Sequence, residues 1–142
     1  MAKILIIDDS VTYRQIMREV LEQGGHTVIG EGEDGIQAIE LYKKLKPDIT
    51  TMDITMPKMN GLVALQWIRE YDPSATVVMV SSTAQSKKLA EAAKLGAADF
   101  LPKPFESTKI MSVVDRLLTA FKETNVDEEI DLNEFDFLDL DD

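Results

Sequence analysis

The chain of 142 residues contains no cysteine and a single histidine, His26. Without cysteine it can form no disulfide, and it can offer no thiol nucleophile or thiolate ligand for zinc. One histidine cannot form a histidine metal cluster either. Because His26 stands at the start of a strand-like segment, we expect it to be a surface or edge residue without a functional role.

Long apolar runs are also missing from the sequence. No segment approaches the ~20 consecutive apolar residues that a membrane-spanning helix needs. The N-terminal residues MAKILIIDD lack the long apolar core of a signal peptide and reach two aspartates by position 9. These absences predict a cytoplasmic protein that does not insert into membranes.

Positive charge is scarce at one end of the chain. The formal net charge is -11, yet residues 1–122 carry 16 acidic and 15 basic residues, so that the remaining -10 falls on residues 123–142, which hold ten acids and no lysine or arginine. We expect a nearly neutral globular domain over 1–122 and an acidic-hydrophobic tail over 123–142. No basic stripe is present, so binding to DNA is not expected.

The first 122 residues alternate between strand-like and helix-like patterns. Near-continuous apolar runs are typical of parallel strands covered on both faces. The pattern predicts an α/β fold with a five-stranded, doubly wound parallel sheet and helices on both faces. The predicted strands are 3–8, 26–32, 48–53, 76–82 and 99–103.

Apolar side chains at helical spacing predict the helices between these strands. The first stripe holds Tyr13, Ile16, Met17, Val20 and Leu21; the second holds Ile36, Ile39, Tyr42 and Leu45; the third holds Leu62, Leu65 and Ile68; and the last runs from Ile110 to Phe121. The fourth helix, roughly 86–95, has the shallow stripe Leu89, Ala92 and Ala93. Small side chains bury less area, so we expect this helix to be held least firmly.

Chemically active side chains stand at the carboxyl ends of the predicted strands. In open parallel sheets the ligand crevice lies beyond these ends, where the strand order reverses. The strand ends supply three carboxylates, a hydroxyl and an ammonium: Asp8, Asp9, Asp53, Ser81 and Lys103. We therefore expect these groups to gather at one edge of the sheet.

Three carboxylates at one point repel each other, by about 1 to 4 kcal/mol per ionised pair at ~4 Å. A hard divalent cation and a lysine would offset this repulsion, and Mg²⁺ prefers a few carboxylates with a carbonyl and waters. A carboxylate beside bound Mg²⁺ can act as a nucleophile toward a phosphoryl group, with Lys103 stabilising the transferred charge. The alternative is that each aspartate merely caps the helix that follows it.

Four segments together carry a resemblance to a known family: IIDDS, TMDITMPKMNG, VMVSSTAQ and DFLPKPF. In this order, over residues 1–122, they resemble the receiver domain of two-component response regulators. Among receivers the chain is most similar to the single-domain chemotaxis, or CheY-like, type, in particular through TMDITMP. The resemblance implies the flavodoxin-like, CheY-like fold.

The resemblance also implies a role for individual residues. Asp53 would accept the phosphoryl group, with Lys103 and Ser81 completing the catalytic set. Asp8, Asp9, Asp53 and the main chain at Thr55 would bind Mg²⁺. Ser81 and Phe100 would form the conformational switch, while Thr55 and Thr83 would tune dephosphorylation; Pro104 is expected to follow a cis peptide bond.

On this basis the chain is expected to be a phosphoacceptor signalling protein rather than an enzyme. A histidine kinase would phosphorylate it, and the phosphorylated form would bind a motor switch protein or a phosphatase in chemotaxis or flagellar motor control. The alternative is a phosphorelay intermediate that passes the group from Asp53 to a downstream histidine. A Mg²⁺-dependent phosphatase is disfavoured because Thr55 stands where a second catalytic acid would be needed.

The tail interleaves apolar residues with its acids: Ile130, Leu132, Phe135, Phe137, Leu138 and Leu140. A purely solvating tail would have few apolar residues. The pattern favours a docking segment that binds a basic, apolar groove, either on a partner or on the domain itself near Lys87, Lys88 and Lys109. An unstructured solubilising tail remains the alternative.

Overall fold

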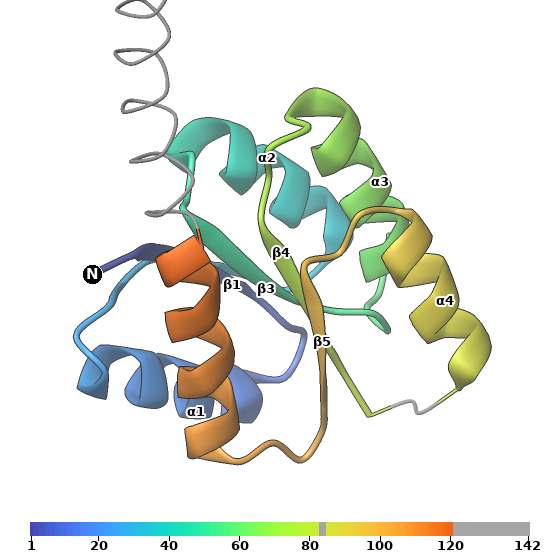
Figure 1. Cartoon of the computed structure of the whole chain (residues 1–142). Coiled ribbons are helices and arrows are strands. Elements are labelled where there is room, and N and C mark those ends of the chain that lie inside the picture. Colours follow the sequence, from blue (N-terminus) through green and yellow to red (C-terminus); the bar gives the residue numbers. More distant parts are fainter. Residues whose placement is uncertain (83–84, 121–142) are drawn as a thin grey trace, which may run out of the picture.

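The computed structural model describes residues 1–82 and 85–120, which form a twisted sheet flanked by helices (Figure 1). A further helix over residues 107–120 follows the last strand and is called the C-terminal helix below. The elements in chain order are β1 (Lys3–Ile7), α1 (Val11–Gln23), β2 (Thr27–Gly32), α2 (Gly35–Leu45), β3 (Ile49–Asp53), α3 (Gly61–Tyr71), β4 (Val77–Ser81), α4 (Ser86–Lys94) and β5 (Asp99–Pro102).

The five strands pair in the order β2-β1-β3-β4-β5, and every pair is parallel. The predicted fold is thereby confirmed, with each observed strand lying within one predicted range. Because β2 and β3 lie on opposite sides of β1, the strand order reverses between β1 and β3. This reversal fixes the place where a crevice opens beyond the strand ends.

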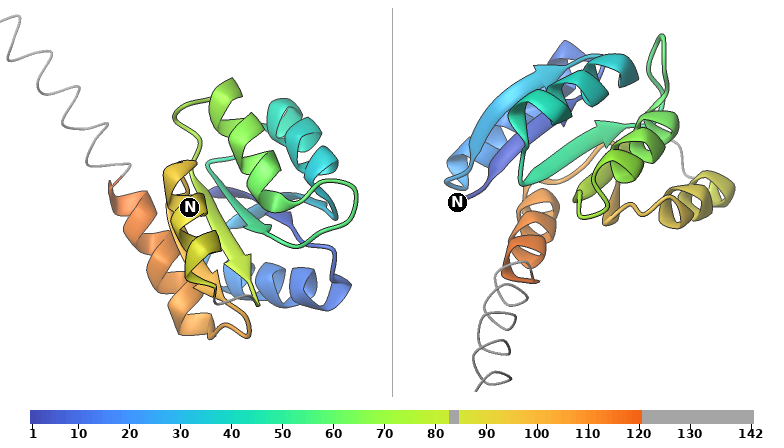
Figure 2. Two further views of the ribbon diagram at one scale, coloured as in Figure 1. Left: turned by 90° about the vertical axis from the view of Figure 1, so that its right-hand side faces the viewer. Right: turned by 90° about the horizontal axis from the view of Figure 1, so that it is seen from above.

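Side chains alternate between the two faces of the sheet and build two separate cores. Helices lie on both sides of the sheet (Figure 2). In β1, Leu5 and Ile7 belong to the core beneath α2, α3 and α4, whereas Ile4 and Ile6 belong to the core beneath α1 and the C-terminal helix. This is the period of two expected of a strand. Helices therefore cover both faces, as in a doubly wound sheet.

Side-chain caps define where three of the helices begin. Ser10, Asp34 and Asn60 each occupy the N-cap position, and each side-chain oxygen accepts a hydrogen bond from the backbone N–H three residues later. Such caps satisfy one of the backbone donors that a helix start leaves open. Since Ser10 caps α1, the alternative that Asp9 serves as the cap is wrong.

Two residues of the apolar stripes predicted for the first two helices were assigned to the core incorrectly. Ile16 is 40% exposed and Ile36 is 43% exposed. In α2 the buried face contains Ala38 and Tyr42; because successive helix residues turn by about 100°, Ile36 lies about 200° from Ala38 and faces outward. Ile16 lies by the same geometry at the margin of the face that buries Met17.

The shallow contact predicted for α4 is found in the structure. Ala92 is the one fully buried residue within Ser86–Lys94, and the N-cap Gln85 makes no side-chain capping hydrogen bond. Leu89 is half-buried, whereas Ala93, predicted on the inner face, is exposed. With so little apolar area covered, α4 depends on fewer stabilising contacts than its neighbours.

His26 is buried, at 8% exposure, so its assignment to the surface was wrong. Its Nδ1 accepts a hydrogen bond from the backbone N–H of Ala2 at 3.2 Å. Burial, followed by the charge of the N-terminus, lowers the pKa of His26. The residue therefore helps to fix the N-terminal strand.

In residues 1–82 and 85–120, no helix has the length and apolar character to cross a membrane.

One polar contact joins α2 to the end of α3. The hydroxyl of Tyr42 donates a hydrogen bond of 2.6 Å to Asp72, which also accepts from the backbone and side chain of Ser74. The hydrogen bonds from Tyr42 and Ser74 lower the pKa of Asp72. Burial and the bond to Asp72 raise the pKa of Tyr42, which therefore remains a donor at neutral pH.

We predict that Tyr42→Phe lowers the free energy of unfolding by about 1 kcal/mol at pH 7, because a hydrogen bond to a partly exposed carboxylate is lost. Because the pKa of Asp72 is lower in the folded protein than in the unfolded chain, the hydrogen bond stabilises the fold at pH values above the unfolded pKa. This stabilisation is lost as the pH falls through the folded pKa. The difference from wild type should therefore shrink below about pH 4. Urea unfolding at several pH values measures it.

Tyr71→Phe is the matched control for this variant, since Tyr71 is 52% exposed and Tyr42 keeps its bond to Asp72. We expect a change within about 0.5 kcal/mol. A Tyr42→Phe difference that stays constant from pH 7 to pH 3 would contradict the coupling to Asp72.

Candidate functional site

Three aspartates meet at the carboxyl ends of β1 and β3, where the strand order reverses. Asp53 is the last residue of β3, and Asp8 and Asp9 follow β1 directly. One carboxylate oxygen of each lies within 4.8 Å of the others. Asp8 and Asp53 are buried, at 5% and 6% exposure, whereas Asp9 is exposed. Two carboxylates are therefore held inside the protein and the third faces solvent beside them.

Lys103, which follows β5, reaches across the sheet edge to the two buried acids. Its Nζ lies 2.7 Å from Oδ2 of Asp8 and 3.0 Å from Oδ2 of Asp53. The Lys103 side chain is only 7% exposed. The peptide bond between Lys103 and Pro104 is cis, as predicted. The gathering of strand-end groups expected from the sequence is thus observed for the aspartates and the lysine.

Burial and the ion pair act in opposite directions on Asp53. Burial raises the pKa of the Asp53 carboxyl, and the hydrogen bond from Lys103 opposes that rise without cancelling it. For Lys103, burial lowers the pKa, but hydrogen bonds to Asp8 and Asp53 outweigh it and the net shift is upward. Lys103 therefore keeps its charge at neutral pH, which a buried lysine without partners would tend to lose.

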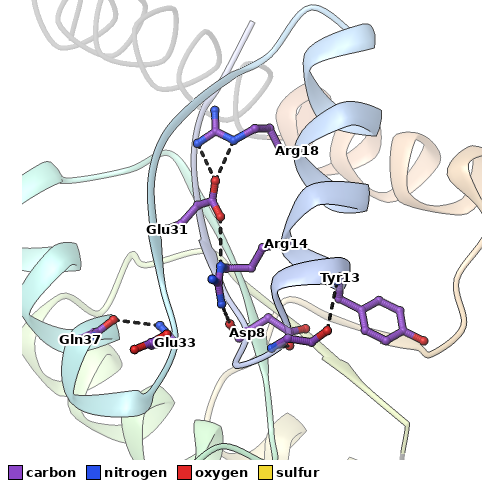
Figure 3. A network of polar contacts seen from close by, with 8 residues as sticks. Asp8, Tyr13, Arg14, Arg18, Glu31, Glu33 and Gln37 are labelled. Atoms are coloured by element: carbon purple, nitrogen blue, oxygen red, sulfur yellow. Dashed lines mark hydrogen bonds and ion pairs between the residues drawn. The ribbon is translucent and has the colours of Figure 1, made fainter.

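A network of arginines on α1 holds the end of β1 (Figure 3). Arg14 donates a 2.6 Å hydrogen bond to the carbonyl oxygen of Asp8 and pairs with Glu31 of β2 at 3.0 Å. Arg18 pairs with the same Glu31 at 2.7 Å. In addition, Oδ1 of Asp8 accepts from the backbone N–H of Ser10 at 2.9 Å. Both the main chain and the carboxylate of Asp8 are thereby fixed.

The loop between β3 and α3 needs a glycine at its end. Gly61, the first residue of α3, lies so close to the chain that a Cβ atom there would be 1.9 Å from the carbonyl oxygen of Asp53. Its backbone N–H donates a hydrogen bond of 2.7 Å to the carbonyl oxygen of Ile54. Any side chain would collide with main-chain atoms, so glycine allows α3 to begin directly beside Asp53.

Three of the other predicted site residues lie in the described part of the chain, and they differ in burial. Ser81, the last residue of β4, is 1% exposed and its carbonyl oxygen accepts from the backbone N–H of Lys103 at 2.9 Å. Thr55 is exposed, and its N–H donates to Oδ1 of Asp53 at 3.3 Å. Phe100 on β5 is half-buried against the α2–α4 core. Thr83 lies outside the described residues.

Two residues near the site were not identified as functional from the sequence. Tyr13 was assigned to a buried stripe, yet its ring centroid lies 4.1 Å from Nζ of Lys103. Arg14 was not singled out at all. The only signal in the sequence was their place in the first turn of the helix that follows Asp8 and Asp9, where side chains lie near the strand ends.

The cluster has the composition of a site for a hard divalent cation. Its ligand atoms are oxygens, and three carboxylates face one ammonium within the described part of the chain, which leaves an excess of negative charge. Mg²⁺ favours a few carboxylates with room for water ligands, and the exposed Asp9 leaves one side of the cluster open to solvent. The residues therefore fit Mg²⁺.

Comparison with known proteins identifies the family. The family model for the response regulator receiver domain matches residues 4–115 of this chain. Chemotaxis protein CheY of Thermotoga maritima is 40% identical over 115 residues, which cover 81% of this chain and 96% of that protein. Protein CcdB of Bacillus subtilis is 47% identical over 118 residues, covering 83% and 98%.

A solved structure gives the same result for the fold. A chain in the crystal structure of the CheX–CheY–BeF3–Mg²⁺ complex from Borrelia burgdorferi aligns with a TM-score of 0.80 and 33% identity, covering 82% of this chain and 88% of that one. The parallel sheet, the site at its carboxyl edge and these matches agree. The chain belongs to the response regulator receiver domain family and has CheY-like chemotaxis proteins among its homologues.

Proposed function

We propose that the chain is a stand-alone response regulator that accepts a phosphoryl group on Asp53 from a histidine kinase in a Mg²⁺-dependent reaction. The observation that carries this proposal is the position of Lys103 Nζ between Asp8 and Asp53, with Asp9 beside them. The cluster combines a nucleophilic carboxylate, oxygens that suit a divalent cation, and a fixed positive charge. These are the groups that formation of an aspartyl phosphate requires.

In the proposed step, an oxygen of the Asp53 carboxylate forms a bond to phosphorus. The P–N bond to the donor's imidazole breaks, and its electron pair returns to that nitrogen. Lys103 turns from the Asp53 carboxylate to the transferred phosphoryl oxygens, and the Ser81 hydroxyl donates to one of them. These donors stabilise negative charge that has moved outward from the carboxylate.

The Mg²⁺ ligands in this proposal are Asp8, Asp9, Asp53 and the main-chain oxygen of Thr55. Bound Mg²⁺ would supply positive charge that offsets the repulsion among the carboxylates and the incoming phosphoryl group. Asp8 is held for this task by Ser10 and Arg14, and the exposed Asp9 keeps the cluster open to solvent. Hydrolysis of the aspartyl phosphate returns the protein to its starting state, at a rate tuned by Thr55 and Thr83.

The proposed output is phosphorylation-dependent protein binding in chemotaxis or flagellar motor control, by a protein in the cytoplasm. Several relatives bear the name chemotaxis protein CheY, which supports this choice. The switch residues are Ser81 and Phe100, and α4 is the element that moves most easily because Ala92 alone anchors it fully. The target is a motor switch protein or a phosphatase.

The acidic-hydrophobic tail, residues 123–142, is proposed to be a docking segment outside the receiver domain of residues 1–122. Ten acids oppose packing of the tail on itself, and six large apolar residues favour contact with another surface. A groove that is both basic and apolar would satisfy both features, on a partner or on the receiver domain itself.

The first test of the proposal is the phosphorylation of Asp53. Wild type incubated with acetyl phosphate and Mg²⁺ should gain the mass of one phosphoryl group, and Asp53→Asn should gain none, because an amide is not a nucleophile toward phosphorus. Intact-mass spectrometry measures both. The matched control is Asp48→Asn, which should label like wild type. Asp48 is exposed and precedes β3, so it lies at the amino ends of the strands, away from the site. Equal labelling of Asp53→Asn would refute the assignment.

The second test concerns Mg²⁺ and stability. A ligand that binds only the native state adds RT ln(1 + [L]/Kd), or about 2.7 kcal/mol at a hundredfold excess over Kd. Thermal melts of wild type should therefore shift upward with millimolar Mg²⁺. Asp9→Asn should shift much less, and Asp48→Asn should shift as wild type does. If the melting temperature of wild type is the same with and without Mg²⁺, the proposed metal site is wrong.

The third test removes the tail. Truncation after Lys122 should leave labelling of Asp53 unchanged, because the site lies wholly within the receiver domain. It should weaken binding to the physiological partner, more strongly at low salt, where charge attraction is least screened. Affinity measured at two salt concentrations checks both parts. Unchanged affinity and unchanged salt dependence would show that the tail is not a docking segment.

A further inference from the structure

The ring of Tyr13 lies over the ammonium of Lys103. Nζ of Lys103 lies 4.1 Å from the ring centroid, well within the range of a cation–π contact. The same nitrogen donates to Asp53 at 3.0 Å and pairs with Asp8 at 2.7 Å. The lysine head is therefore enclosed by two carboxylates and an aromatic face, and its side chain is 7% exposed.

Two contacts hold Tyr13, one at its backbone and one at its ring. Its backbone N–H donates to the capping oxygen of Ser10 at 3.2 Å, which fixes the first turn of α1. Its ring packs against the ring of Phe105 at a centroid distance of 5.6 Å and an interplanar angle of 58°. Tyr13 and Arg14 point to opposite sides of that turn (Figure 3). The first turn of α1 thus supports both Lys103 and the main chain of Asp8.

An aromatic face suits this position for a physical reason. A third carboxylate beside Lys103 would compete with the phosphoryl group for the ammonium, and a purely aliphatic side chain would cover the ammonium without attracting its charge. The π-face attracts the ammonium but accepts no strong hydrogen bond. It can hold Lys103 near the acids and still release its N–H groups to new acceptors.

We propose that Tyr13 is a positioning residue for the reaction: its ring holds the Lys103 ammonium where it meets the transferred phosphoryl group. This role rests on the proposed function of Asp53 as phosphoacceptor. The ring face carries the effect, so the hydroxyl of Tyr13 is not needed, and an aliphatic side chain of similar size cannot replace it.

Kinetics with a small donor test this role without contacts to a kinase. The rate of Asp53 labelling by acetyl phosphate at saturating Mg²⁺ is compared for wild type, Tyr13→Phe and Tyr13→Leu. Tyr13→Phe should stay within about twofold of wild type. Tyr13→Leu should lose about fivefold in rate at saturating donor, the size expected for one lost cation–π contact.

A second readout does not depend on activity. In wild type and Tyr13→Phe, the ring current should shift the Lys103 Cε protons upfield in NMR spectra, whereas Tyr13→Leu should return them to ordinary values.

If Tyr13→Leu does not fold, phenylalanines with increasing fluorination at position 13 replace it. The labelling rate should then fall with each added fluorine, because fluorine weakens the π-face at nearly constant shape.

The outcomes separate the two proposals. An unshifted Lys103 signal in wild type, an undiminished rate in Tyr13→Leu, or equal losses in Tyr13→Phe and Tyr13→Leu would each overturn the positioning role. Wild type that accepts no phosphoryl group would overturn the function of Asp53, and the role of Tyr13 in it. In that case the NMR shift would still establish whether the ring contacts Lys103.

Discussion

Electrostatic balance at the carboxyl edge of the sheet is the constraint on which the rest of the structure depends. Two buried carboxylates and one buried ammonium are stable together only because Lys103 lies within 3.0 Å of both Asp8 and Asp53. Removing one partner from such a group leaves an uncompensated buried charge, which is strongly destabilising. The three carboxylates and one ammonium nevertheless leave an excess of negative charge, and this excess suits the cluster to a divalent cation.

The fold brings these groups together from distant points in the sequence. Asp8, Asp53 and Lys103 stand at the ends of three parallel strands, so the topology of the sheet, and not proximity along the chain, makes them neighbours. The surrounding contacts then fix each group. Arg14 holds the carbonyl of Asp8, Gly61 allows α3 to begin against Asp53, and Tyr13 covers Lys103.

The sequence allowed prediction of the strands and their chemically active ends, because buried parallel strands are apolar runs and a polar residue at their end is conspicuous. It did not allow prediction of Tyr13 above Lys103 or of the burial of His26. An aromatic residue at helical spacing looks the same whether it packs in a core or covers an ammonium. A histidine that accepts a hydrogen bond from Ala2 requires a long-range contact that no local pattern encodes. The predicted burial of Ile36 was wrong for a simpler reason, because Ala38 lies on the buried face of α2 in its place.

The receiver domain also combines a firmly held site with a loosely held neighbour. Asp8 and Asp53 are fixed by β1 and β3 in the middle of the sheet, where each strand pairs on both sides. Ser81 ends β4, and Phe100 lies on β5 at the edge, beside α4 with its single buried alanine. In the proposed function, a new charge on Asp53 would therefore meet resistance from the centre of the sheet and much less from the α4 side. Because little buried area holds α4, a modest gain in hydrogen bonding at Ser81 would suffice to shift it. The proposed switch would thereby couple chemistry at Asp53 to a surface that a partner can contact.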